Sequence, residues 1–142
     1  MKLWHVGVLT ENLEKAVRTF EVIPGINSDE WKACELAFTQ EDMLVGVGGT
    51  LKTVMCMIGG LCYEFIEPLT DTSYHYHELE KKGPGIHHVA YSCPGNMAEV
   101  LGSLLAKGGR IVWEIQRKEH VCYVELPDDR IILEIIDIDL MQ

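Results

Sequence analysis

His5 and His88 occupy equivalent places in two similar segments of the chain. Residues 4–8 read WHVGV and residues 86–91 read IHHVAY. Both segments have the apolar, β-branched character of a strand, and imidazole is the commonest protein ligand for metals. We interpret the two segments as copies of one metal-binding unit.

A glutamate lies among apolar residues later in each half. Residues 62–66 read CYEFI and residues 132–136 read ILEII. If these runs are strands, each glutamate shares a face with two apolar neighbours. A carboxylate on a buried face is costly unless it is paired, protonated or bound to a metal. The sequence therefore predicts one divalent cation held by four ligands: His5, Glu64, His88 and Glu134.

The bulk composition limits the partners. The 142 residues predict a single domain over residues 1–142, and 47% apolar with 24% charged residues is typical of a globular protein. The formal net charge of −10 and a pI near 4.9 argue against nucleic acid and against a membrane surface. We expect a small-molecule substrate.

The cysteines indicate a reducing compartment. There are five of them, an odd number, and none forms a C-x-x-C pair. The first apolar run also lacks the long uncharged core of a signal peptide or membrane span. The expected localisation is cytoplasmic.

The strands and helices predicted around the candidate ligands occur in the same order in both halves of the chain. In the first half, strand patterns cover 3–9, 32–39, 53–58 and 61–66, and a helical stripe covers 13–20. In the second half, strands at 86–93, 110–115, 120–125 and 131–138 accompany a helix after Asn96, and a turn is expected at Pro127-Asp128-Asp129. Asn96 and Glu99 have the spacing of a capping box.

Two β-α-β-β-β repeats, about 1–69 and 84–142, are therefore expected. A duplication of this kind determines the architecture of the fold. A polar linker joins them, with a short helix over 73–82 that ends in Lys81 and Lys82. The predicted fold class is α+β.

The order of His5, Glu64, His88 and Glu134 resembles the vicinal-oxygen-chelate superfamily. That superfamily includes glyoxalase I, methylmalonyl-CoA epimerase, extradiol dioxygenases and antibiotic-resistance proteins. The resemblance implies paired repeats that build a cup-like mixed sheet, with a metal bound on its concave side by these same four residues.

Residues 63–69 (YEFIEPL) and 81–91 (KKGPGIHHVAY) look most like the epimerase branch. Two segments depart from it. Residues 123–130 read like a generic glyoxalase-type hairpin, and residues 48–52 read GGTLK where epimerases tend to carry an acidic base.

The resemblance implies a metal-dependent isomerase that removes a proton next to a carbonyl, similar to methylmalonyl-CoA epimerase, with an acyl-CoA as substrate. Glu134 is the expected catalytic base. One alternative is a lactoylglutathione lyase similar to glyoxalase I, which acts on a hemithioacetal, and another is a small-molecule binding or resistance protein without turnover. A fourth protein ligand disfavours oxygenase chemistry. The metal would be Co²⁺, Ni²⁺, Zn²⁺ or Mn²⁺, and we expect a homodimer.

Five other residues receive structural interpretations. His87 points away from His88 by strand parity and is expected to support it or to lie on the surface. His75 and His77 are expected to be solvated on different faces of a helix, Glu67 to lie on the surface, and Tyr123 to serve packing or be exposed.

Overall fold

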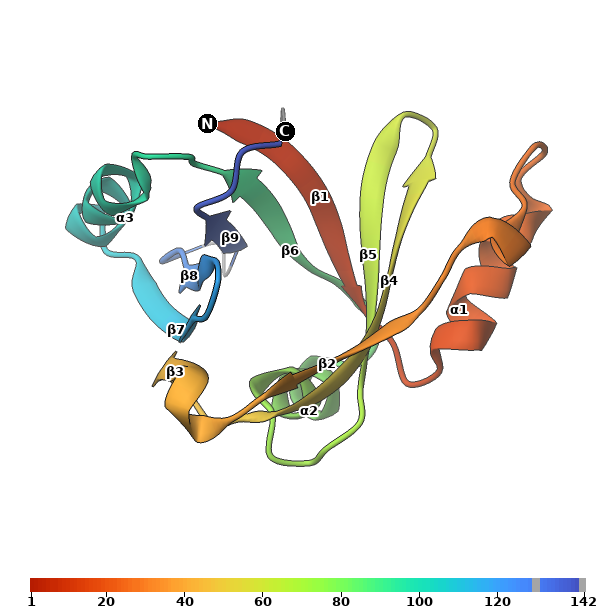
Figure 1. The fold of residues 1–142 in the computed structure, drawn as a ribbon, viewed down its shortest axis with the longest axis horizontal. Coiled ribbons are helices and arrows are strands. Elements are labelled where there is room, and N and C mark those ends of the chain that lie inside the picture. Colours follow the sequence, from red (N-terminus) through yellow and green to blue (C-terminus); the bar gives the residue numbers. More distant parts are fainter. Residues whose placement is uncertain (129–130, 141–142) are drawn as a thin grey trace.

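The computed structural model describes residues 1–128 and 131–140. In this part of the chain, nine strands form one mixed sheet that curves into a nearly closed cup (Figure 1). The predicted α+β fold with a cup-like mixed sheet is thereby confirmed, with one strand more than the two repeats supply.

The first half of the chain contains these elements: β1 (Lys2–Leu9), α1 (Leu13–Thr19), η1 (Phe20–Val22), η2 (Ser28–Glu30), β2 (Cys34–Phe38), η3 (Gln40–Asp42), β3 (Met43–Val45), β4 (Gly49–Ile58) and β5 (Leu61–Pro68). The remainder contains these: α2 (Tyr74–Lys82), β6 (Gly85–Ser92), α3 (Met97–Ala106), β7 (Arg110–Gln116), β8 (His120–Glu125) and β9 (Ile132–Ile136). The predicted turn at residues 127–129 is described only in part, because Asp129 lies outside the described residues.

The sheet has the order β2-β4-β5-β1-β6-β9-β8-β7-β3. At its centre β1 and β6 pair antiparallel, and each has a parallel strand on its other side, β5 beside β1 and β9 beside β6. The pattern of exposed, partly buried and buried residues along β1 is the same as the pattern along β6. The two halves are therefore related by an approximate twofold axis between the central strands.

The additional strand, β3, belongs to the first half in sequence but pairs with β7 of the second half. The turn that leads into it is held by Asp42, whose Oδ2 accepts a hydrogen bond from the backbone N–H of Thr39 at 2.8 Å. Gln40 then bonds both Gly46 O and Gly48 N at 3.2 Å. A strand of three residues is too short to show periodicity, so no sequence pattern predicts it.

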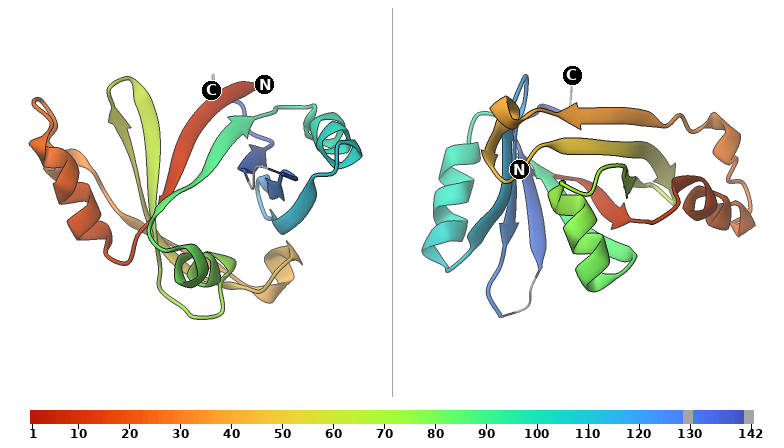
Figure 2. Two further views of the ribbon diagram at one scale, coloured as in Figure 1. Left: turned by 180° about the vertical axis from the view of Figure 1, so that it is seen from behind. Right: turned by 90° about the horizontal axis from the view of Figure 1, so that it is seen from below.

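Helices α1 and α3 cover opposite outer flanks of the cup, and α2 lies between them (Figures 1 and 2). On one flank Leu13 of α1 packs in a cluster with Val54 and Phe65, and on the other Met97 and Leu101 of α3 pack in a cluster of their own. These outer clusters leave the alternate residues of the same strands to face the interior. No helix in the described ranges is long and apolar enough to cross a bilayer.

Two predictions about helix ends are wrong. Glu67 is not a surface residue, because its Oε1 accepts a hydrogen bond from Leu13 N at 2.7 Å and so caps α1 beside Asn12. Asn96 makes no side-chain capping bond to α3. Its ψ of 20° departs from the extended conformation in which an N-cap side chain reaches the following amides.

Candidate metal centre

The four predicted ligands lie on the four central strands, one on each. His5 is on β1, Glu64 on β5, His88 on β6 and Glu134 on β9. Across the β1–β6 pair His5 is opposite Ala90, and Glu134 is beside Ala90 in the parallel register of β9. The corresponding position in the other half is Gly7, which lies opposite His88 and beside Glu64. One ligand atom of each of the four residues lies within 4.8 Å of the other three.

Most of the separations between the four residues match the distances between neighbouring ligands of one metal ion. The Nε2 atoms of His5 and His88 are 3.2 Å apart, and each lies 3.0 Å from Glu134 Oε2. Glu64 Oε1 is 3.5 Å from His5 Nε2 and 3.8 Å from His88 Nε2. Nitrogen and oxygen ligands about 2.0–2.2 Å from one ion are about 3.0–3.5 Å from one another. The donor set therefore fits a divalent cation.

Burial supports the same conclusion. His5 and His88 are each 1% exposed, and Glu134 is 6% exposed. Glu134 Oε2 is buried and has no hydrogen bond of good geometry within the described residues. A buried carboxylate oxygen without a hydrogen bond is costly, and a cation would remove that cost.

The carboxylates shift the protonation of the metal-free site. Burial lowers the pKa of His5, but its contacts with Glu134 and Glu64 outweigh burial and raise that pKa from 6.5 to about 10. Burial would raise the pKa of Glu134, yet the two histidines bring it below its ordinary value. In the metal-free protein a proton on an imidazole supplies the positive charge that these carboxylates need.

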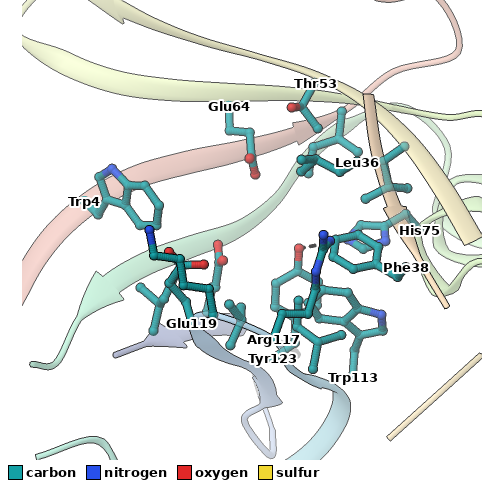
Figure 3. Close-up of a pocket in the computed structure, with 17 residues that line it drawn as sticks. Trp4, Leu36, Phe38, Thr53, Glu64, His75, Trp113, Arg117, Glu119 and Tyr123 are labelled. Atoms are coloured by element: carbon teal, nitrogen blue, oxygen red, sulfur yellow. Dashed lines mark hydrogen bonds between the residues drawn. The ribbon is translucent and has the colours of Figure 1, made fainter. Parts of the chain in front are cut away.

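A cavity of about 380 Å³ adjoins the four residues, and Glu64 and Glu134 both line it. Figure 3 shows Glu64 and Thr53 on one side of the cavity and Tyr123 on the other. Apolar and aromatic side chains form most of its walls, among them Trp4, Phe38, Leu51, Trp113 and Ile136. Residues 117–119 of the β7–β8 turn also line it, and the Arg117 guanidinium carbon lies 5.2 Å from the centre of the Phe38 ring.

His75 and Tyr123 form a buried polar pair in the wall of this cavity. His75 Nε2 and the Tyr123 hydroxyl are 2.8 Å apart, and the two residues are 1% and 3% exposed. Burial lowers the pKa of His75 and raises the pKa of Tyr123, so both are neutral near pH 7. The prediction that His75 is solvated is therefore wrong. His77 is exposed as predicted, because α2 turns only one of its faces toward the sheet.

The His87 side chain is buried, so the interpretation that it lies on the surface is wrong. Its Nδ1 lies 2.9 Å from His88 Nδ1, and its Nε2 lies 3.1 Å from the Tyr74 hydroxyl. No sequence motif singled out Gly7, although a glycine inside a strand pattern signals a close approach of another group. That group is the His88 ring, which an ideal Cβ on residue 7 would meet at 2.0 Å.

Comparisons with solved structures show the same fold. A hypothetical protein of Bacillus halodurans, BH1468, superposes with a TM-score of 0.65 at 22% identity, over 97% of this chain and 94% of that one. Methylmalonyl-CoA epimerase from Mycobacterium tuberculosis has a TM-score of 0.62 at 17% identity, over 95% and 86%. The Streptomyces coelicolor epimerase in complex with 2-nitronate-propionyl-CoA has a TM-score of 0.61 at 18% identity, over 96% and 93%.

A sequence relative and a family model complete the comparison. The uncharacterized protein YqjC of Bacillus subtilis is 32% identical over 96 residues, which are 65% of this chain and 57% of that protein. The model of the glyoxalase/bleomycin resistance protein/dioxygenase superfamily matches residues 4–124. These residues hold three of the four candidate ligands and most of the cup, and by this match the chain belongs to that superfamily.

Proposed function

We propose that this protein is a metal-dependent enzyme that moves a proton at the carbon next to a carbonyl, and that it acts as an acyl-CoA epimerase similar to methylmalonyl-CoA epimerase. One observation carries the proposal: two histidines and two glutamates converge within 4.8 Å, and both glutamates line a cavity of about 380 Å³. That volume is at the small end of the range for ligand pockets, about 300–1,000 Å³. It suits a short acyl group, with the bulk of a coenzyme outside.

His5, Glu64, His88 and Glu134 would hold the cation. When bound, a divalent ion such as Co²⁺, Ni²⁺, Zn²⁺ or Mn²⁺ supplies positive charge that stabilises negative charge developing on the substrate's oxygens.

The chain's own carboxylates would move the proton. Glu134 is ionised at neutral pH, because its neighbours lower its pKa, and it lines the cavity. We assign it the removal of the proton. Glu64 comes from β5, on the other side of the central β1–β6 pair, and would deliver a proton taken up from solvent from the other half of the cup, while Glu134 releases the removed proton to solvent. Two carboxylates from opposite halves suit an epimerisation, which removes a proton from one face and replaces it on the other.

The remaining walls would orient the substrate and exclude water. The apolar and aromatic lining strengthens electrostatic interactions inside the cavity because water is displaced. His75 and Tyr123 add a neutral hydrogen-bonding pair that can meet a polar substrate atom without a competing charge.

A second candidate is a glyoxalase-type lyase that acts on a hemithioacetal. The wall contributed by β2 and β4 consists of Leu36, Phe38, Leu51 and Thr53, so within the described residues it offers no carboxylate. Without a carboxylate on this wall, a glutamate of the proposed metal set would serve as the base. Glyoxalase-type chemistry uses the same kind of base.

Deuterium exchange tests the proposal. The protein is stripped with chelator, reloaded with each of the four metals, and incubated with methylmalonyl-CoA in D₂O, and mass spectrometry follows the α-proton. We expect exchange that depends on metal and is lost in Glu134→Gln, while Glu99→Gln, which changes an exposed carboxylate on α3 outside the cavity, retains it. Formation of lactoylglutathione from the methylglyoxal–glutathione hemithioacetal, without exchange in the acyl-CoA, would favour the lyase. Ligand binding that chelator leaves unchanged, with no turnover of either substrate, would replace both with a binding protein.

A further inference from the structure

We infer that His87 is a positioning residue for the metal ligand His88, and that Glu78 and Tyr74 of α2 orient it; the inference rests on the proposed metal site. The His87 side chain is 2% exposed and lies between His88 and α2. Its Nδ1 is 2.9 Å from His88 Nδ1, and on the far side of the ring its Nε2 is 3.1 Å from the Tyr74 hydroxyl. Glu78 Oε2 is 3.5 Å from the same Nε2.

Metal binding would determine which atom donates and which accepts in the hydrogen bonds that link His88 to His87 and His87 to Tyr74. If His88 binds the ion through Nε2, its remaining proton is on Nδ1, and it donates that proton to Nδ1 of His87. His87 Nδ1 must then be an acceptor, so the proton of its neutral ring is on Nε2. That N–H lies within hydrogen-bond distance of the Tyr74 hydroxyl, which can accept it, and the negative charge of the Glu78 carboxylate is 3.5 Å away.

Glu78 is itself held in place. Lys82, one helical turn further along α2, lies 2.7 Å from Glu78 Oε2. The carboxylate is 12% exposed, so its negative charge acts on His87 in a poorly solvated region. An outer carboxylate that orients a metal-binding histidine usually contacts it directly. Here a second imidazole lies between the carboxylate and the ligand.

Among the described residues, no equivalent series of hydrogen-bonded groups leads away from His5. Trp4 occupies the position before His5 that His87 occupies before His88, and its ring packs edge-on against the His5 ring at 4.5 Å. Nδ1 of His5 is buried and has no hydrogen-bond partner among residues 1–128 and 131–140. The two histidine ligands are therefore equivalent by fold symmetry and different in their support, and His88 is the one that α2 orients.

Cobalt binding tests the inference without any substrate. Two substitutions distinguish the role of the His87 hydrogen-bond acceptor from the role of its side-chain volume. His87→Asn keeps an acceptor near the Nδ1 position, and His87→Leu keeps volume but no polar atom. The dissociation constant for Co²⁺ is measured by chelator competition, together with the visible absorption of the bound ion and the paramagnetically shifted exchangeable N–H proton signals. We expect His87→Leu to bind Co²⁺ about 10–100-fold more weakly and to exchange one ligand N–H faster, with His87→Asn closer to wild type. His77→Leu, on the exposed side of α2, should match wild type.

Glu78→Gln is the milder variant, because it keeps the shape of the side chain and removes its charge. If His87→Leu does not fold in the metal-free form, as judged by circular dichroism, Glu78→Gln decides the question, with a several-fold loss of Co²⁺ affinity expected. Unchanged affinity and spectra in folded His87→Leu, or in Glu78→Gln, would overturn the inference while the metal site stands. A wild-type protein that binds no Co²⁺ would overturn the proposed function together with the inference.

Discussion

The His88 ring occupies the space into which a side chain at Gly7 would project. The two residues are opposite one another across the β1–β6 pair, and an ideal Cβ on Gly7 would lie 2.0 Å from Cε1 and 2.3 Å from Nε2 of the imidazole. Distances this short are not tolerated, so residue 7 must lack a side chain if His88 is to reach the other three ligands.

Replacing Gly7 by alanine should therefore displace His88, one of the four proposed metal ligands. We expect Gly7→Ala to lower the free energy of unfolding by about 1–3 kcal/mol, because a methyl group is forced into a packed site. It should also weaken metal binding, and both effects are measured by urea denaturation and chelator competition. Gly102 is the matched control: nothing lies within 4 Å of its ideal Cβ in α3. Gly102→Ala should be stabilising by about 0.5–1 kcal/mol, and equal behaviour of the two variants would contradict the steric argument.

The metal content of the protein should depend on the four candidate ligands. Elemental analysis after dialysis should find one divalent ion per chain in the wild type and little in His5→Ala or Glu134→Ala, because each removes one ligand from a single shell. His120→Ala removes a histidine that bonds Glu114 at 2.6 Å and belongs to no ligand group, so it should keep its metal. Retention of the ion by both ligand variants would show that it binds elsewhere.

The metal-free protein should lose stability at alkaline pH. The pKa of His5 is raised from 6.5 to about 10, so the folded state holds this proton more tightly than the unfolded chain. A raised pKa contributes stability that is fully present below pH 6.5 and is lost as pH rises through about 10. Urea denaturation between pH 7 and pH 10 should therefore show a steeper decline for wild type than for His5→Gln. Parallel profiles for the two proteins would rule out His5 as the source.

The hydrogen bond between His75 and Tyr123 in the cavity wall should contribute to the stability of the fold. Tyr123→Phe leaves His75 Nε2 buried without its partner, which costs about 1–3 kcal/mol in the free energy of unfolding. Thermal and urea denaturation measure this loss, and metal content should not change. Tyr63→Phe is the control, since within the described part of the chain the Tyr63 hydroxyl makes no hydrogen bond. A similar loss in both variants would mean that the hydroxyl bond to His75 contributes little.

The fold and the four candidate ligands could be predicted because each left a local pattern. Strand periodicity and the repetition of a histidine-bearing strand are visible within short windows, and a glutamate between apolar residues is unusual enough to notice. The identical burial patterns of β1 and β6 show why repetition was informative, since both strands meet the same environment.

The surroundings of the ligands could not be predicted in this way. His75 was expected in solvent because helix periodicity says which residues share a face but not which face meets the sheet. The roles of His87 and Glu67 depend on contacts with α2 and α1, which are set by tertiary packing. The strand β3 exists only through its pairing with β7, more than sixty residues away in sequence.

That pairing of β3 with β7 affects how the protein unfolds. A chain made of two similar modules could melt in two steps, one for each module. Here the second module cannot open at β7 without releasing a strand that the first module supplies, and the first cannot open at β3 without leaving β7 as a bare edge. The central β1–β6 pairing joins the modules a second time. Cleaving the chain in the linker after Gly83 should consequently leave two fragments that remain associated and lose their structure in one cooperative transition.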